Sequence, residues 1–424
     1  MSNTLCSYVF AHTNIDPNGD IEFCCAVQGG AHRDPEGRVY NVQTHTIKEA
    51  WNSPQIRNTR MAMIRGERPE MCNYCWRMEN EDNTQGNSVR LYSANKRISL
   101  DSVQDRIEYA RTHDGALSDE FLAFEFQLSI GNLCNLACKM CNTGFSTQYQ
   151  KFFSRFHNSP NEISFVLGYP NINQGHPEFG TTFDWPTKQP LAEIFADHLQ
   201  TVQQIFFTGG EPTLIPQVKE FIDHLADVEK RQDFNPWVST NCTNINKELI
   251  DSLEKFNSVS INMSLDGMDD IAYIQRTPSH WPSLEKNIDT LFDWLLTTEK
   301  TDVCLNVHTT VTALNLHHVV DFWKYLDIKY QSRFGVGIGL ILNKDINFGI
   351  EIIPKTVAEQ LKKQVQHELK YCSDRLKVAY LEFEKILDNT NFADDFESIH
   401  FCLDQVQRYH PDLDIRQIYS IYYN

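Results

Sequence analysis

The sequence lacks long apolar runs, and none approaches the roughly 18 residues that a membrane helix needs. Its first residues also lack the basic and then apolar order of a signal peptide. Positive charge is scarce, with 38 Lys and Arg against 56 Asp and Glu and a formal net charge of −18. Such a balance disfavours nucleic acid and anionic membranes as partners. We therefore expect a cytoplasmic protein with no membrane and no nucleic-acid partner.

The sequence also lacks internal repeats and low-complexity tracts, which excludes solenoids and long disordered tails. Hydrophobic residues make up 41% of the chain and charged residues 22%, as in a folded globular protein. A length of 424 residues allows roughly two or three domains.

Six apolar segments in the middle of the chain have the length and pattern of buried strands. They are Leu122–Ser129, Gln204–Phe207, Trp237–Thr240, Val259–Leu265, Val303–Val311 and Phe334–Leu342. Amphipathic helices at Leu214–Lys230 and Pro282–Thr298 lie between them. Repeated strand–helix units form a parallel sheet, either an open doubly wound sheet or a partial barrel. This pattern predicts an α/β domain over residues 120–345.

The flanking regions differ from this α/β pattern. Residues 1–95 contain a tight-turn signal at Asn18-Gly19 and few long apolar elements, so this small α+β module needs a metal to stabilise it. Residues 346–424 have a helical, acidic pattern. Residues 157–190 are rich in Gly, Pro and Asn, which favours either a substrate-facing insertion or a plain surface loop.

The 12 cysteines are unevenly placed. In the cytosol such residues are metal ligands or free thiols more often than disulfides. Four of them are scattered and are expected to be small buried apolar residues, namely Cys242, Cys304, Cys372 and Cys402. The others gather near the N-terminus and just after the first predicted strand.

The second of these groups, Cys134-x3-Cys138-x2-Cys141, is suited to an iron–sulfur cluster. A [4Fe–4S] cluster normally takes four cysteines, so three leave one iron with an open position. An open coordination position is what a catalytic metal site requires. The loop follows a strand directly, which is where barrel loops carry chemistry.

This motif, together with Thr208-Gly209-Gly210-Glu211-Pro212 after the second strand, resembles the radical S-adenosylmethionine (SAM) superfamily. The resemblance implies a partial (β/α)6 TIM-like barrel, with the small N-terminal α+β domain before it and a helical C-terminal tail after it. It also implies that Cys134, Cys138 and Cys141 hold a [4Fe–4S] cluster whose open iron binds SAM.

The resemblance extends to residues that would contact SAM. These are Gly209, Gly210, Glu211, Asn241, Ser264, Arg276 and Met140. Glu211 would accept from the SAM ammonium, Arg276 would pair with its carboxylate, and Asn241 and Ser264 would line its ribose. For single residues the alternatives are helix capping, turn formation or a surface charge. Two positions depart from the family pattern: Met140 replaces an aromatic residue, and Cys242 stands where Gly is common.

The N-terminal cysteines resemble the SPASM and twitch modules of the same superfamily. Cys6, Cys24, Cys72 and Cys75 would hold a second, auxiliary [4Fe–4S] cluster, with Cys25 as an alternative to Cys24. No further cysteine lies between Trp76 and Leu100, as in the shorter twitch form. The module precedes the barrel, whereas in relatives it usually follows. A structural zinc site is the alternative.

The resemblance implies an iron–sulfur-dependent oxidoreductase. SAM would be cleaved to a 5′-deoxyadenosyl radical that removes a hydrogen atom from the substrate, with electrons from a flavodoxin or ferredoxin. We expect oxidative modification of a peptide or protein side chain. The alternatives are radical oxidation or epimerisation of a small molecule such as a sugar or nucleotide, and a non-enzymatic iron–sulfur or zinc interaction protein. Glu125 is a weak candidate for a catalytic base.

Overall fold

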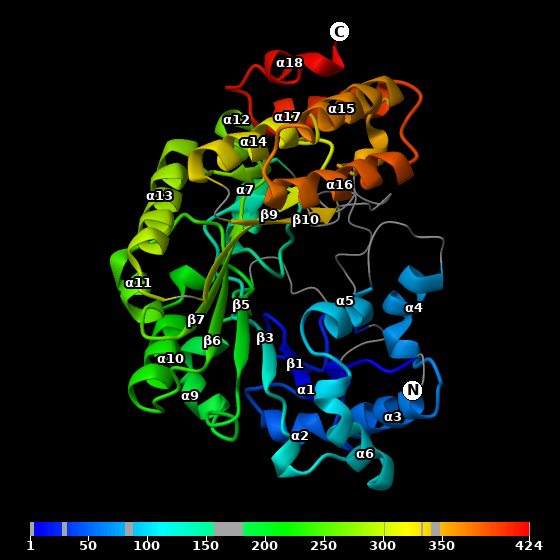
Figure 1. Cartoon of the computed structure of the whole chain (residues 1–424), viewed down its shortest axis with the longest axis vertical. Coiled ribbons are helices and arrows are strands. Elements are labelled where there is room, and N and C mark those ends of the chain that lie inside the picture. The colour runs from blue at the N-terminus through cyan, green and yellow to red at the C-terminus, as the bar shows by residue number, and fades with distance from the viewer. Residues whose placement is uncertain are drawn as a thin grey trace.

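A parallel sheet of six strands forms the centre of the molecule (Figure 1). The computed structural model describes residues 4–27, 32–80, 88–156, 181–300, 302–331, 334–340 and 348–423. The six strands are β3 (Glu125–Ser129), β5 (Gln204–Thr208), β6 (Asn235–Thr240), β7 (Ser258–Ser264), β9 (Asp302–Val311) and β10 (Gly335–Leu340). They correspond to the six predicted segments.

These strands follow one another across the sheet in chain order, from β3 to β10. A doubly wound sheet would reverse its strand order at a switch point. The sequential order is that of a singly wound barrel, and β3 and β10 are not neighbours in the described sheet. The partial (β/α)6 barrel expected from the sequence is therefore confirmed. The predicted loop at 157–190 lies outside the described residues as far as residue 180.

Helices cover the outer face of the sheet. They are α7 (Thr147–Phe153), α9 (Leu191–Ile194), α10 (Pro216–Asp227), α11 (Lys247–Leu253), α12 (Asp269–Gln275), α13 (Trp281–Thr297) and α14 (Val319–Tyr330). In β7, alternate residues turn toward these helices: Val259, Ile261 and Met263 are buried, and the residues between them are half-buried. Side chains of the second set therefore face the concave side of the sheet.

The N-terminal module is built around a hairpin and several helices. Its elements are α1 (Tyr8–Ala11), β1 (His12–Ile15), β2 (Ile21–Glu22), α2 (Ile47–Trp51), α3 (Pro54–Ile64), α4 (Asn73–Asn80), α5 (Val89–Lys96) and α6 (Gln104–Thr112). Gly19, in the turn between β1 and β2, has a φ of +92°, which glycine adopts without strain. Thr46 and Glu49 form a capping box that starts α2.

The hairpin continues the barrel sheet. Strand β1 pairs in parallel with β3, from His12 opposite Glu125 to Ile15 opposite Leu128, and extends the sheet to eight strands. This pairing could not be predicted from the sequence, because all four residues of β1 are buried and the strand shows no alternation. The module and the barrel therefore share backbone hydrogen bonds.

Arg97 joins the module to the barrel a second time. Its guanidinium forms a buried ion pair with Glu125 of β3 and donates a hydrogen bond to the Tyr8 hydroxyl over 2.8 Å. It also lies 4.7 Å from the ring centroid of Trp237 in β6. A cation held by a carboxylate and an aromatic face in this way fixes the relative positions of the two parts.

The C-terminal region is helical, as the sequence predicts, and it packs firmly on the barrel. Its helices are α15 (Lys355–Glu368), α16 (Asp374–Asn389), α17 (Glu397–Tyr409) and α18 (Ile415–Ile418). The Tyr380 hydroxyl of α16 donates to the Val320 carbonyl of α14, and Phe383 is fully buried. In Figure 1 these helices lie at the opposite end of the molecule from α2, α3 and α6.

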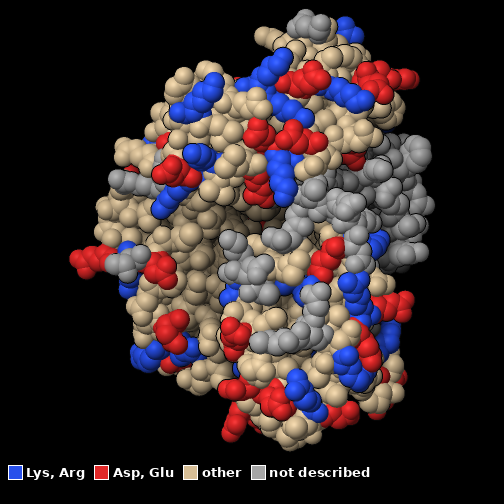
Figure 2. Space-filling model, turned by 45° about the vertical axis from the view of Figure 1, so that its right-hand side comes forward, with Lys and Arg blue, Asp and Glu red and all other residues tan. Residues whose placement is uncertain are grey.

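Acidic and basic side chains are interspersed over the described part of the face in Figure 2. Among the described residues, every helix is too short or too polar to span a bilayer.

We expect replacement of Arg97 by Met to lower the free energy of unfolding by about 3–5 kcal/mol, because Glu125 would be left buried without its partner. Denaturant unfolding followed by circular dichroism would measure this loss. The matched control is Arg57→Met, which breaks the exposed pair with Asp114 and should cost roughly 0–1 kcal/mol. The double variant Arg97→Met/Glu125→Met should regain most of the loss. If the single and double variants were equally unstable, the loss would come from the other contacts of Arg97, with Tyr8 and Trp237, and not from an unpaired Glu125 carboxylate.

Candidate functional site

The three clustered cysteines lie on the loop that leaves the carboxyl end of β3. Part of this loop is the short strand β4 (Ala137–Cys138), which pairs antiparallel with β8 (Arg276–Thr277). The pairing brings the Arg276 guanidinium to 3.7 Å from the Cys138 sulfur. A predicted SAM ligand and a predicted cluster ligand are thus neighbours, although they are far apart in the sequence.

The pKa values of the thiols in this loop depend on burial and on the charges of the neighbouring cysteines. Burial, and then the charge of Cys138, raise the pKa of Cys134 to about 12. Burial and the charges of Cys138 and Cys134 raise the pKa of Cys141 well above its ordinary value. Free thiols in this setting stay protonated, and coordination to a cation is what removes their protons. The donor set therefore fits an iron–sulfur cluster, which supplies that positive charge.

Arg276 is held in place by Asp266. Its Nε donates to Asp266 Oδ2 over 2.6 Å, and Asp266 Oδ1 accepts the backbone N–H of Thr310 over 2.8 Å. Burial lowers the pKa of Arg276, but the charge and hydrogen bond of Asp266 together with the charges of Cys138 and Cys141 outweigh burial, so the pKa lies above its ordinary value. Asp266 was not among the residues predicted from the sequence, although it lies two residues after Ser264, a predicted SAM contact.

Gly209 and Gly210 pack against the cysteine loop through backbone atoms. A Cβ on Gly210 would lie 2.1 Å from the Leu133 carbonyl oxygen, and Gly209 has a φ of +111°. The Glu211 N–H donates to the Leu133 carbonyl over 2.8 Å. Glycine is required here because the two loops touch directly. This reason is separate from the approach of SAM that the resemblance implies.

The Glu211 carboxylate is buried and joins the ends of β5 and β6. Its Oε1 accepts from the Thr213 and Thr240 hydroxyls, both over 2.8 Å, and its Oε2 accepts the Asn241 N–H over 2.7 Å. Burial raises the pKa of Glu211, whereas these hydrogen bonds lower it. The carboxylate therefore holds Asn241 in position as well as lying at the predicted SAM site.

The remaining predicted SAM contacts lie at the same edge of the sheet. The Asn241 side chain donates to Asn135 of the cysteine loop over 3.0 Å. Ser264, at the end of β7, and Met140, before the third cysteine, are half-buried. Cys242 has a φ of +62°, so its backbone takes the left-handed conformation that explains why glycine is common there.

Glu125 lies apart from this group. It stands at the amino end of β3, whereas the cysteine loop leaves the carboxyl end, and its carboxylate pairs with Arg97. This position gives no support to a catalytic role.

Lys139, between the second and third cysteines, was not singled out by the sequence analysis. Its side chain is fully buried, and the rings of Phe152 and Phe153 in α7 lie 4.7 and 5.2 Å from its Nζ. A charged residue inside a cysteine motif is an available signal in the sequence, but the aromatic residues around it come from other segments.

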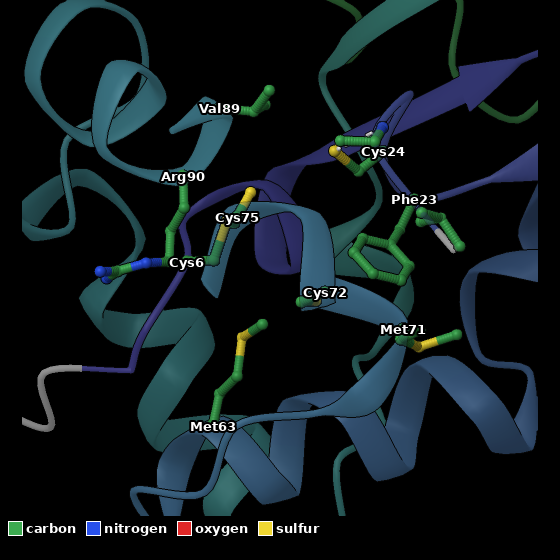
Figure 3. A pocket seen from close by; sticks show the side chains of 11 residues that line it. Cys6, Phe23, Cys24, Met63, Met71, Cys72, Cys75, Val89 and Arg90 are labelled. Atoms are coloured by element: carbon green, nitrogen blue, oxygen red, sulfur yellow. Dashed lines mark hydrogen bonds between the residues drawn. The ribbon is translucent and has the colours of Figure 1, made fainter. Parts of the chain in front are cut away.

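A second group of thiols surrounds a pocket in the N-terminal module (Figure 3). Cys6, Cys24, Cys72 and Cys75 all line it, and its unfilled space, open mouth included, is about 330 Å³. The other lining residues are mostly apolar: Phe23, Ala26, Val27, Met63, Met71, Val89 and the stem of Arg90. Figure 3 shows Met63 pointing into the pocket from α3. Cys25 is exposed and does not line the pocket.

Backbone N–H groups point at the sulfurs of this pocket. The Ala26 N–H donates to the Cys24 sulfur over 3.4 Å. Burial raises the pKa of Cys6 to about 12, although hydrogen bonds from the backbone N–H groups of Tyr8 and Val9 act in the opposite direction and lower it. Burial likewise raises the pKa of Cys75, opposed by the N–H groups of Arg90 and Val89 at the start of α5. Four thiols in an apolar pocket, three of them with N–H···S contacts, fit an iron–sulfur cluster.

Nowhere in the described ranges do three or more His, Cys, Asp or Glu side chains come close enough together to hold a single metal ion. The four N-terminal thiols therefore line the pocket at positions too far apart to hold a single metal ion together.

Comparison with known proteins gives two matches to family models. Residues 128–293 match the radical SAM superfamily, and residues 6–76 match SPASM, an iron–sulfur cluster-binding domain. No curated protein matches the sequence. The SPASM match at the N-terminus agrees with the predicted order of the two modules.

Solved structures that match part of this chain include SuiB of Streptococcus suis bound to SAM, with 14% identity and a TM-score of 0.37 over 77% of this chain. The chain spans 63% of the length of SuiB. Another is anSMEcpe with bound SAM and a peptide, with 15% identity and a TM-score of 0.37 over 57% of this chain and 58% of the other.

The two domain families use SAM and iron–sulfur clusters, the cofactors predicted from the sequence. The central domain, residues 128–293, therefore matches the radical SAM superfamily, and a domain that matches the iron–sulfur cluster-binding SPASM family precedes it.

Proposed function

We propose that this protein is a radical SAM enzyme in which Cys134, Cys138 and Cys141 hold a [4Fe–4S] cluster. The observation that carries the proposal is the direct contact between the cysteine loop and the Gly209-Gly210-Glu211 loop at the carboxyl edge of the sheet. With its cofactors bound and one electron supplied, such a site cleaves SAM to methionine and a 5′-deoxyadenosyl radical, which removes a hydrogen atom from the substrate.

The protein's own residues would position SAM and keep its charges paired. Arg276 stands beside Cys138 with its orientation fixed by Asp266, so it presents a cation at the place where a SAM carboxylate would bind. Asn241, Ser264 and Met140 lie around the same edge and would contact the nucleoside part. Glu211 keeps the ends of β5 and β6 together and presents a buried negative charge to the SAM ammonium.

We further propose that Cys6, Cys24, Cys72 and Cys75 hold an auxiliary [4Fe–4S] cluster. Four cysteine ligands leave no open iron, which favours an electron-transfer role over substrate binding. That role fits a net oxidation of the substrate, with a flavodoxin or ferredoxin as external electron donor. A structural zinc ion is the alternative occupant of the pocket.

The side chains on the concave face of the sheet are suited to a neutral, polar substrate such as a peptide. Half-buried amide and hydroxyl side chains line it, including Gln127, Ser260, Asn262, Asn306 and Thr310. Such groups both donate and accept hydrogen bonds, as peptide groups do. We therefore propose modification of a peptide or protein side chain.

The test of the radical SAM assignment is the triple variant Cys134→Ala/Cys138→Ala/Cys141→Ala after anaerobic reconstitution. We expect about eight irons in the wild type and about four in the variant, because each Cys-ligated cubane holds four. Chromatography with mass spectrometry should detect 5′-deoxyadenosine from the wild type with SAM and dithionite, and none from the variant. Continued production by the variant would refute the assignment. About four irons falling to none, with zinc in both proteins, would make the N-terminal site structural.

A matched pair of variants tests the auxiliary ligands. Cys24→Ser should lower the iron content by about four atoms, because Cys24 lines the pocket. Cys25→Ser should keep the full content, because Cys25 is the exposed neighbour. Iron and sulfide analysis measures both. The reverse result would make Cys25 the ligand, and full iron in both variants would remove the cluster from this pocket.

Deuterium transfer separates the peptide and small-molecule alternatives. Extract from cells grown on deuterated medium should label 5′-deoxyadenosine in an anaerobic reaction, because the radical takes a hydrogen atom from the substrate. For a peptide or protein substrate, protease treatment of the extract should abolish the label. Label that survives protease and passes a small-pore filter would instead identify a small molecule.

A further inference from the structure

The cysteine loop and α7 carry positive charge in a chain that is strongly acidic. Residues 126–156 contain three basic residues and no Asp or Glu, whereas the whole chain has a formal net charge of −18. One of the three, Lys139, is buried, so the surface charge of this segment comes from Lys151 and Arg155, which are both exposed. A local basic surface therefore adjoins the three clustered cysteines.

Two large apolar side chains of the same segment are exposed. Leu133, directly before the first cysteine, is 47% exposed, and Phe145 is 37% exposed. Thr147 starts α7, and its N–H donates to the Asn132 carbonyl over 2.9 Å, while its hydroxyl donates to the Cys134 carbonyl over 3.3 Å. Leu133 lies between those two partners, and Phe145 is two residues before Thr147. The exposed apolar surface is therefore next to the first predicted cluster ligand.

Helix α7 connects this apolar surface with the exposed cations. Thr147 and Lys151 are four residues apart, so they lie on one face of the helix about one turn from each other. Beyond the end of α7 the Arg155 N–H donates to the Phe152 carbonyl over 3.3 Å, so the chain keeps turning and brings Arg155 near Lys151. The exposed set, which we call the loop face, consists of Leu133, Phe145, Lys151 and Arg155.

Helix α17 borders the loop face. Its exposed Arg408 donates to the Phe156 carbonyl, next to Arg155, over 2.7 Å. Asp404 and Asp412 are exposed on either side of Arg408 in the chain. The acidic residues of the C-terminal region therefore begin at α17, and the excess of positive charge belongs to the α7 side.

The loop face has the properties of a docking surface for an electron donor. Cys134 and Cys141 are half-buried, so a cluster that they hold would lie close to the surface of the molecule. Electron-transfer proteins dock through small interfaces, which bury less than about 1,200 Å². Opposite charges steer such encounters, and like charges oppose them. A donor with an acidic surface is repelled by the net charge of the chain and attracted only by a basic surface such as this one.

We propose that the loop face is the docking site of a small acidic electron-transfer protein, such as a flavodoxin or ferredoxin, that reduces the cluster on Cys134, Cys138 and Cys141. Leu133 and Phe145 form the apolar centre of the contact, and the two cations form its rim. One electron passes from the reduced donor, which is oxidised, to the cluster, which is reduced, and no bond is made or broken. This inference rests on the proposed function and names the surface through which that site receives its electron.

The test measures how fast a reduced flavodoxin or ferredoxin, whichever reduces the wild type faster, reduces the reconstituted full-length protein. In samples frozen at successive times, the electron paramagnetic resonance signal that changes on addition of SAM reports the cluster in question. Lys151→Glu/Arg155→Glu should lower the rate about tenfold at low ionic strength, because repulsion replaces attraction. The difference from the wild type should shrink as salt is added.

The matched control is Lys377→Glu/Lys385→Glu, which makes the same change of net charge at exposed positions of α16. It should keep the rate within about twofold of the wild type, because charges more than a Debye length from the contact are screened. Phe145→Ser keeps the charge and should also slow reduction by the protein donor. Dithionite is a small reductant that needs no docking surface, so it should reduce every variant to the same extent.

Equal slowing of the α7 and α16 double variants would overturn the inference, because net charge and not the loop face would then control the encounter. Unchanged rates in both Lys151→Glu/Arg155→Glu and Phe145→Ser would overturn it too, as would a wild type that dithionite reduces but neither protein donor does. A wild-type dimer that Lys151→Glu/Arg155→Glu converts to a monomer in size-exclusion chromatography would make the loop face a self-association surface and also overturn it. Absence of a SAM-sensitive signal after dithionite would instead mean that the proposed function itself has failed.

Discussion

The site depends on one close contact, the packing of the Gly209-Gly210 backbone against the backbone of the cysteine loop. A side chain at Gly210 would overlap the Leu133 carbonyl oxygen, so the two loops can meet only where glycine stands. Glu211 then connects the ends of β5 and β6 through buried hydrogen bonds. These contacts place the three thiols, Arg276 and Asn241 at one edge of the sheet before any cofactor binds.

The same edge is supported from both ends of the chain. The N-terminal module adds its β1 to the barrel sheet beside β3, the strand that carries the cysteine loop. Arg97 reinforces this junction through Glu125 and Trp237. From the other end, α17 packs behind the loop through Tyr409 and His410. The cysteine loop therefore lies between two regions that the radical SAM match does not include.

The cysteine loop concentrates buried titratable groups, so it needs the packing that β1, Arg97 and α17 provide. The loop brings together three thiols whose burial raises their pKa values, and the charges of neighbouring cysteines raise those of Cys134 and Cys141 further. Arg276 stands beside them and is paired with Asp266, whereas burial lowers the pKa of the nearby Lys139 to about 7. Without a bound cluster the site holds protonated thiols. With a cluster, thiolates and cations would offset one another, so the arrangement of charges is complete only in the loaded protein.

The sequence by itself determined the six barrel strands, the two cysteine groups and the family, because alternation, strand length and motif spacing are local properties. Tertiary structure decided the rest. It selected Cys24 over Cys25 as the residue that lines the pocket, and it placed Glu125 in a junction away from the cysteine loop. It also brought Tyr409 to Lys139. Contacts between distant segments depend on how elements pack, and no periodicity within either segment encodes them.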